Sequence, residues 1–300
     1  MDLNALAGCV SSSGCLVTQT SSGLIVGLLL FLVAAGLTLI FGVLKVVNFA
    51  HGTFYMLGAY FALSTYQFTG SYLAAVAAGC VGMGLFGIAF ERFLISRAYG
   101  TNVLMQLLIC YAVVLIFDDV VKMVWGADFQ SMGMPPAFQV PPYFIAGGIV
   151  PPFYLVLIGV ALAVALVLGV ALAATRAGKI VRAAAVNPEM VSVLGINTTL
   201  LYALVFAVGG GLAGLAGALA APVRSLTPGM GFSVLIESFI VTVIGGMGSI
   251  AGSLIAAILL GMIRSFGTIG FPLFTDELIF GFMIVVLITR PTGLFGREVV

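Results

Sequence analysis

Residues 176–199 read RAGKIVRAAAVNPEMVSVLGINTT and form the longest polar and basic stretch after the first apolar segment begins. They separate two strongly apolar segments, 151–174 and 200–222. Each of these segments is long enough to span a bilayer, which takes about 20 helical residues. The polar stretch is therefore predicted to join two membrane helices outside the hydrocarbon.

Within this stretch, residues 188–194 are predicted to form a short helix with its own start and stop signals. Asn187 can cap the helix, Pro188 suits its first turn, and Glu189 faces the positive end of the helix dipole. Gly195 can adopt the left-handed conformation that ends a helix. The apolar residues of the segment are Met190, Val191, Val193 and Leu194. Two interpretations stay open, because such a helix can dock on a soluble partner or lie on lipid headgroups.

The composition indicates a membrane protein with many spans. Of the 300 residues, 62% are hydrophobic and 7% are charged, whereas a soluble domain carries about 25% charged residues. The net charge of +1 gives no reason to expect a nucleic-acid partner.

The predicted fold is all-α, one transmembrane domain over residues 1–300 with a polar N-terminal tail at 1–22. We expect about eight transmembrane helices plus a broken or re-entrant helix pair near 232–263, where GGMGS at 245–249 interrupts the apolar run. Polar backbone at such a break must be buried in protein or face a water-filled cavity. The apolar segments are 23–44, 50–68, 71–90, 102–124, 151–174, 200–222, 232–263 and 277–290.

Basic residues suggest the orientation, since they concentrate on the cytoplasmic side of a membrane protein. They follow the first, third, fifth and last segments, which predicts an external N-terminus and a cytoplasmic C-terminus. Arg224 and Arg264 then fall on the external side and count against the scheme. Cys9 and Cys15 can pair only if the N-terminus faces an oxidising compartment, and the sequence leaves free thiols equally open.

The sequence has no motif for nucleotide binding, metal binding or catalysis. There is no Walker A pattern, because Gly178–Lys179 lacks the upstream glycine that a phosphate cradle needs. His51 is the single histidine, and no Cys/His metal spacing occurs. We therefore expect no cofactor on this chain and no enzymatic activity, including that of an intramembrane hydrolase.

A polar hinge follows the first apolar segment, from Lys45 to His51. Asn48 and His51 could line or cap the start of the next helix, with Gly52 allowing close approach. The alternative is an ordinary interfacial turn with Lys45 and His51 reaching the headgroups.

Two further polar features lie in or beside apolar segments. Glu237 could contact the ammonium group of a solute, lie at the external interface or pair with Arg224, since a carboxylate in lipid is costly. Asp118 and Lys122 have the spacing of a local ion pair.

Small residues also repeat at a spacing that lets helices pack closely. They are Gly210 with Gly214, and Gly248 with Gly252. Packing within this chain is the simpler interpretation, and sliding between transport states is the functional one.

Four blocks of sequence, in order along the chain, resemble the permease family of branched-chain amino acid ABC importers. The resemblance extends from residue 36 to 296 and is greatest for the LivH-like half of the permease pair. The blocks are NFAHG at 48–52, RAAAVNPE at 182–189 closing on GIN at 195–197, ESF at 237–239 followed by GGMGS at 245–249, and RPTGLFG at 290–296.

This resemblance implies a multi-pass subunit of a bacterial inner-membrane importer. Its partners would be a second homologous permease subunit, two cytoplasmic ATPase subunits that bind ATP and Mg²⁺, and a periplasmic substrate-binding protein. The loop at 176–199 would be the cytoplasmic coupling loop. Other substrates, such as urea, amides or aromatic acids, and an ion-coupled secondary transporter remain alternatives.

The resemblance also suggests roles for individual residues. Those expected to couple to the ATPase are Arg182, Asn187, Pro188, Glu189, Met190, Leu194 and Gly195. Those expected along the translocation path are Asn48, His51, Gly52, Glu237, Gly245, Gly246 and Gly248.

Overall fold

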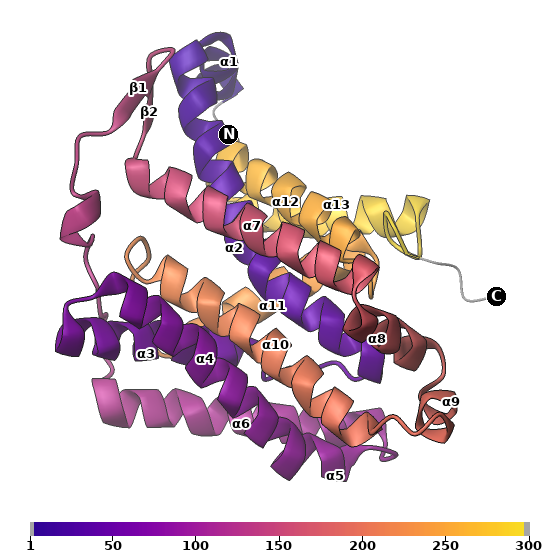
Figure 1. The fold of residues 1–300 in the computed structure, drawn as a ribbon. Helices are drawn as coiled ribbons and strands as arrows, with labels where there is room; N and C mark the ends of the chain where they lie inside the picture. Colours follow the sequence, from indigo (N-terminus) through magenta and orange to yellow (C-terminus); the bar gives the residue numbers. More distant parts are fainter. Residues whose placement is uncertain (1–2, 297–300) are drawn as a thin grey trace.

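The protein is a bundle of tilted helices arranged around one long buried helix, α2 (Figure 1). The computed structural model describes residues 3–296. Six helices of this part are long and apolar enough to cross a membrane, which agrees with the predicted all-α membrane fold. The helices are α1 Leu3–Ser11, α2 Ser13–Leu44, α3 His51–Thr69, α4 Tyr72–Phe90, α5 Ser96–Ala98, α6 Val103–Trp125, α7 Pro152–Ala174, α8 Arg176–Val186, α9 Pro188–Val193, α10 Thr198–Ala220, α11 Met230–Gly245, α12 Ile250–Gly270 and α13 Thr275–Thr289. A π-helical turn, Glu91–Ile95, joins α4 to α5, and a 3₁₀ turn, Pro136–Phe138, lies in the loop after α6.

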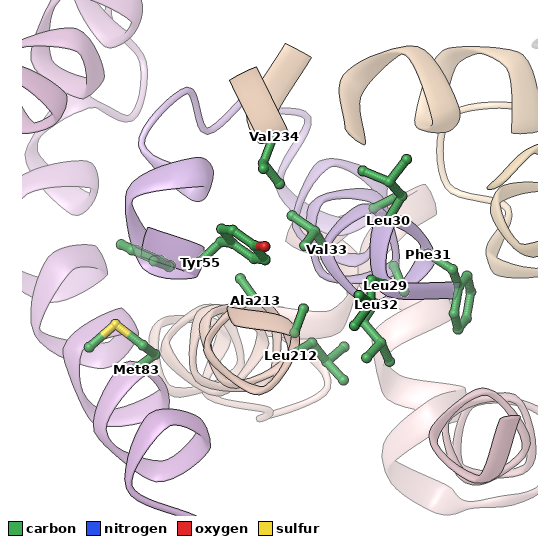
Figure 2. Close-up of a cluster of buried hydrophobic side chains, with 14 of the residues drawn as sticks. Leu29, Leu30, Phe31, Leu32, Val33, Tyr55, Met83, Leu212, Ala213 and Val234 are labelled. Atoms are coloured by element: carbon green, nitrogen blue, oxygen red, sulfur yellow. The ribbon is translucent and has the colours of Figure 1, made fainter. Parts of the chain in front are cut away.

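The core forms around α2 and α10: α2 packs against α10, α11 and α12, and α10 packs against α3 and α4. Figure 2 shows side chains of α2, Leu29 to Val33, beside residues from α3, α4, α10 and α11. α10 packs closely against α4 because it carries glycines at the contact. A Cβ on Gly210 would lie only 2.7 Å from the Met83 carbonyl oxygen of α4. The glycine spacing of α10 therefore serves packing within this chain.

The predicted polar tail at 1–22 is wrong as a description of the N-terminus. α1 occupies residues 3–11, and α2 begins at Ser13, ten residues before the predicted apolar segment. Polar side chains are tolerated here because they bond to helix carbonyls: Thr18 donates to Gly14 O at 3.0 Å and Ser21 to Thr18 O at 2.9 Å. A disulfide joins Cys9 to Cys15 across the turn between the two helices.

A short β-hairpin covers the N-terminal end of α2. Strand β1, Tyr143–Ile145, pairs antiparallel with β2, Gly148–Val150. Ser13 Oγ donates to Ala146 O at 3.0 Å, and the Ile149 amide donates to Thr18 Oγ1 at 3.0 Å. The loop between α6 and α7 therefore lies at the same end of the bundle as the disulfide, whereas α8 and α9 lie at the opposite end (Figure 1).

The predicted interruption of the 232–263 segment is confirmed. α11 ends at Gly245 and α12 begins at Ile250. Gly246 and Gly248 both have positive φ, +97° and +93°, a conformation that glycine adopts without steric cost. The chain thus reverses direction at a glycine turn instead of forming one long helix.

Candidate functional site

The α8–α9 loop has the local structure that its sequence predicts. Asn187 Oδ1 accepts a hydrogen bond from the Met190 amide at 2.9 Å and so caps α9. Gly195 has φ +82°, and its amide donates to Ser192 O at 2.9 Å. Pro188 occupies the first turn of the helix. Six residues with these signals form a helix because both ends are closed by their own neighbours.

α9 is attached to the bundle by one side chain and presents the others outward. Val191 is 2% exposed, whereas Val193 is 83% exposed. Met190 and Leu194 are also exposed, as is Glu189 in the first turn. α9 therefore offers an apolar surface beyond the ends of the membrane helices (Figure 1).

Arg182 lies apart from the α9 surface. Its guanidinium donates to the Ala173 carbonyl oxygen at the end of α7, at 3.4 Å. It also borders a groove of about 530 Å³ between α7 and α12, whose lining includes Leu166 and Leu254. The groove is apolar apart from the arginine, so Arg182 belongs to the α7–α8 corner and not to the exposed helix.

The hinge between α2 and α3 turns back into the protein. His51 Nε2 hydrogen-bonds with Val33 O at 3.0 Å, although α2 continues for eleven residues beyond Val33 to Leu44. Because α3 starts at His51, it begins beside the middle of α2. The interfacial-turn interpretation is wrong for His51, which is fully buried, and stays a prediction for Lys45, which is exposed.

Asn48 stabilises this inward segment. Its Oδ1 accepts from the Ala50 amide at 3.0 Å and lies 3.8 Å from the Cys110 thiol. Asn48 Nδ2 and His51 Nδ1 are buried, and neither has a hydrogen-bond partner among the described residues. Gly52 brings α3 against α11, since a Cβ there would lie 2.8 Å from Leu235 Cβ.

The glycine turn between α11 and α12 is closed by the C-terminal segment. The Leu294 amide donates to Ile244 O at 2.8 Å, and the Phe295 amide donates to Gly245 O at 3.1 Å. Two carbonyls at the end of α11 are thereby satisfied. The GGMGS and RPTGLFG blocks, about fifty residues apart in sequence, form one unit.

Glu237 is paired, but not with Arg224 as the sequence spacing allowed. It forms a salt bridge with Arg264 of α12, while Arg224 lies near the Tyr55 hydroxyl. Both arginines are half-buried. Each of these positive charges therefore has a polar neighbour within the protein.

The seven residues expected along a path do not converge on one cavity. Asn48, His51 and Gly52 lie at the start of α3, Gly245 and Gly246 are covered by the C-terminal segment, and Gly248 borders the groove beside Arg182. Glu237 borders a separate pocket of about 180 Å³ between α11 and α13. Their role in transport therefore stays a prediction.

Comparison with known proteins gives the family of this chain. Residues 19–288 match the family described as "Branched-chain amino acid transport system / permease component". The chain belongs to this permease family.

Relatives of the permease cover nearly its whole length. The high-affinity branched-chain amino acid transport system permease protein BraD of Pseudomonas aeruginosa is 32% identical, over 93% of this chain and 95% of the relative. LivH of Escherichia coli is 28% identical with the same coverage. A probable LivH of Methanocaldococcus jannaschii is 27% identical, over 90% of this chain and 89% of the relative. No solved structure matches the permease significantly.

The permease also holds a buried hydroxyl cluster that sequence reasoning missed. Thr38 Oγ1 lies 3.2 Å from Thr242 Oγ1 and 2.9 Å from Ser253 Oγ, so α2, α11 and α12 are linked by side-chain hydrogen bonds. Each of the three helices carries several hydroxyl residues, and nothing in the sequence pairs these three.

The predicted ion pair between Asp118 and Lys122 is wrong, because the lysine has another partner. Lys122 binds Asp119 Oδ1 at 2.8 Å, not Asp118. Both spacings are compatible with a helix surface. Asp118 instead lies near the Gly229 backbone, where the last third of α6 approaches the start of α11.

A buried tyrosine–glutamate pair supports the corner after α4. Tyr99 OH donates to Glu91 Oε1 at 3.0 Å. Burial, followed by the nearby Glu91 carboxylate, raises the pKa of Tyr99. The phenol therefore stays protonated and keeps its hydrogen bond at physiological pH.

Proposed function

We propose that this permease is one of two membrane subunits of an ATP-driven importer for branched-chain amino acids in a bacterial inner membrane. A second homologous permease subunit completes the translocation path. Two cytoplasmic ATPase subunits bind ATP and Mg²⁺ and supply the energy, because this chain has no phosphate-binding motif. A periplasmic substrate-binding protein delivers the solute.

The observation that carries the proposal is α9, a helix capped at both ends whose apolar side chains, apart from the buried Val191, are exposed. In water such a surface favours a protein partner, since burial of apolar area stabilises an interface. The preceding helix α8 carries Arg176, Lys179 and Arg182, which favours the cytoplasmic side, where an ATPase would lie.

The opposite end of the bundle supports the same orientation. It carries the Cys9–Cys15 disulfide, and disulfides persist in oxidising compartments such as the periplasm. Both observations support the proposed orientation, an external N-terminus and a cytoplasmic C-terminus.

Movement of α9 would be transmitted to the membrane helices through the contacts that hold α9 to the bundle. Val191 is buried, and α9 is joined directly to α8 and, through Gly195, to α10. α10 packs against α2, α3 and α4 along most of its length. When the ATPase subunits close on ATP, a displacement of α9 would therefore tilt α10 as a rigid body and open the path.

The test is ATP-dependent leucine uptake by proteoliposomes that hold both permeases and both ATPases, with the binding protein added outside. Glu189→Arg and Gly195→Val are expected to reduce uptake several-fold while the complex stays folded, because one reverses a charge at the contact and the other strains a residue with φ +82°. Normal uptake by both variants at normal expression would show that α9 is not the contact.

The same preparation distinguishes the alternatives. Uptake driven by an ion gradient through the permeases alone would establish a secondary transporter. ATP-dependent uptake of urea, an amide or an aromatic acid in place of leucine would keep the importer and change its substrate.

A further inference from the structure

The pocket between α11 and α13 combines apolar and ionised walls. Its volume is about 180 Å³, which corresponds to about six water molecules at their liquid volume. That is the scale of one small amino acid. The lining residues are Ser233, Ile236, Glu237 and Ile240 of α11 and Asp276, Ile279 and Phe280 of α13.

This face of α11 is unsuited to contact with lipid. Glu237 is the eighth of sixteen residues in an apolar helix, and a carboxylate at that depth is costly unless it meets protein or water. Its partner Arg264 comes from the neighbouring helix α12. The α11–α13 face therefore borders either water or another subunit, as a translocation path between two permeases requires.

The ion pair leaves part of its bonding capacity free. Glu237 Oε1 binds the Arg264 guanidinium, whereas the buried Oε2 has no hydrogen-bond partner in the part of the chain that the structure describes. Asp276 adds a second carboxylate to the same wall. The pocket therefore presents an acidic wall to the ammonium group of a zwitterion.

We infer that this pocket receives the branched-chain amino acid during its passage, a role that rests on the proposed function. The ammonium group binds Glu237 and Asp276, and the carboxylate binds the Ser233 hydroxyl. The branched side chain packs against the remaining wall, formed by Ile236, Ile240, Ile279 and Phe280.

The pocket lies at the end of the bundle from which solute would arrive. Ser265, next to Arg264, donates to the Gln19 carbonyl oxygen at 2.7 Å, so this part of α12 lies beside the N-terminal part of α2. The Arg264 guanidinium competes with the solute's ammonium group for Glu237. Binding is therefore weak, as release in every cycle demands.

Asp276 allows a clean test because its neighbour is a matched control. Asp276 and Glu277 are both exposed in the first turn of α13, but only Asp276 lines the pocket. In the complete importer, Asp276→Asn is expected to lower ATP-dependent leucine uptake about tenfold, the effect of losing one charge-assisted hydrogen bond. Glu277→Gln is expected to keep wild-type uptake.

The apolar wall is tested by a change of size. Ile236→Phe should fill the pocket and lower leucine uptake relative to alanine uptake by about tenfold, since alanine needs less space. Basal ATP hydrolysis by each variant complex reports whether the subunits have assembled, so that a folding defect is not mistaken for a defect in the pocket.

Different results would contradict the pocket assignment and the proposed importer function. The pocket assignment would be overturned if both Asp276→Asn and Ile236→Phe kept wild-type uptake and the wild-type leucine-to-alanine ratio. It would also be overturned if Glu277→Gln lost as much uptake as Asp276→Asn. Either result would leave the proposed importer function intact. Lack of any ATP-dependent amino acid uptake by the wild-type assembly would overturn both.

Discussion

The α9 loop and the Gly245–Ser249 turn both interrupt long apolar sequence with glycine, yet they are held in different ways. α9 is closed by Asn187 and Gly195, which lie eight residues apart. The turn is closed by Leu294 and Phe295, which donate to carbonyls about fifty residues earlier in the chain. The first is a local structure and the second depends on the assembled bundle.

This difference predicts opposite responses to mutation. A locally closed, exposed helix can be altered without loss of the fold, so its changes should show in function. A turn completed by a distant segment belongs to the packed core, so its changes should show first in stability.

The largest effect is expected from Gly252→Val. A Cβ at this position would overlap the Gly245 carbonyl and lie 2.7 Å from its carbon, and such overpacking costs about 3 kcal/mol of folding free energy. Thermal unfolding and size-exclusion chromatography in detergent should show little folded permease. Gly159→Val in α7 is the control, because no atom lies within 4 Å of its Cβ position. Equal thermal stability of the two variants would show that the turn is not part of the packed core.

The next effect is expected from ending the chain after Arg290. The truncation removes the donors to Ile244 O and Gly245 O, at a cost of about 2 kcal/mol for two buried hydrogen bonds. Thermal unfolding of the detergent-solubilised permease measures the loss. A chain that ends after Gly296 retains both bonds and should unfold like wild type. Wild-type stability of the shorter chain would show that the C-terminal segment does not stabilise the glycine turn.

A smaller effect is expected from Thr38→Val, which removes the hydroxyl between Thr242 and Ser253. Both neighbours keep backbone acceptors, Ser238 O and Ser249 O, so the cost should be about 0.6 kcal/mol, as for other hydrogen bonds between membrane helices. A double-mutant cycle with Ser253→Ala should give a coupling energy of that order. Strict additivity of the two changes would show that the hydroxyls do not interact.

The smallest effect on stability is expected from Asn187→Ala. The lost cap destabilises α9 by about 1 kcal/mol, but α9 is exposed and its fraying leaves the bundle intact. Thermal unfolding should therefore match wild type while ATP-dependent uptake falls. If unfolding shifts as much as in the chain truncated after Arg290, α9 is part of the core after all.

Sequence patterns predicted most of the helices because their causes are local. Membrane spans follow from runs of apolar residues, and the ends of α9 follow from an Asn–Pro start and a glycine stop. The prediction missed the helix over residues 13–22 because its hydroxyl groups bond to carbonyls one turn away, which composition does not reveal.

Side-chain partners across helices were less predictable. Glu237 could be recognised as a costly charge, but the choice of Arg264 over Arg224 depends on which helix packs beside α11. The burial of His51 likewise depends on the hinge turning inward against Val33, and a polar hinge of the same sequence could equally have faced the headgroups.

The sequence by itself determined that this protein is an all-α membrane permease with a capped helix in a basic loop, because hydropathy, caps and family motifs act within short stretches. Only the tertiary structure decided that the GGMGS turn is closed by the C-terminal segment and that Glu237, paired with Arg264, lines the pocket between α11 and α13. The physical reason is that apolar helices offer many equivalent packing faces. A glycine contact or one buried polar bond selects among these faces, and such a contact exists only after the helices have assembled.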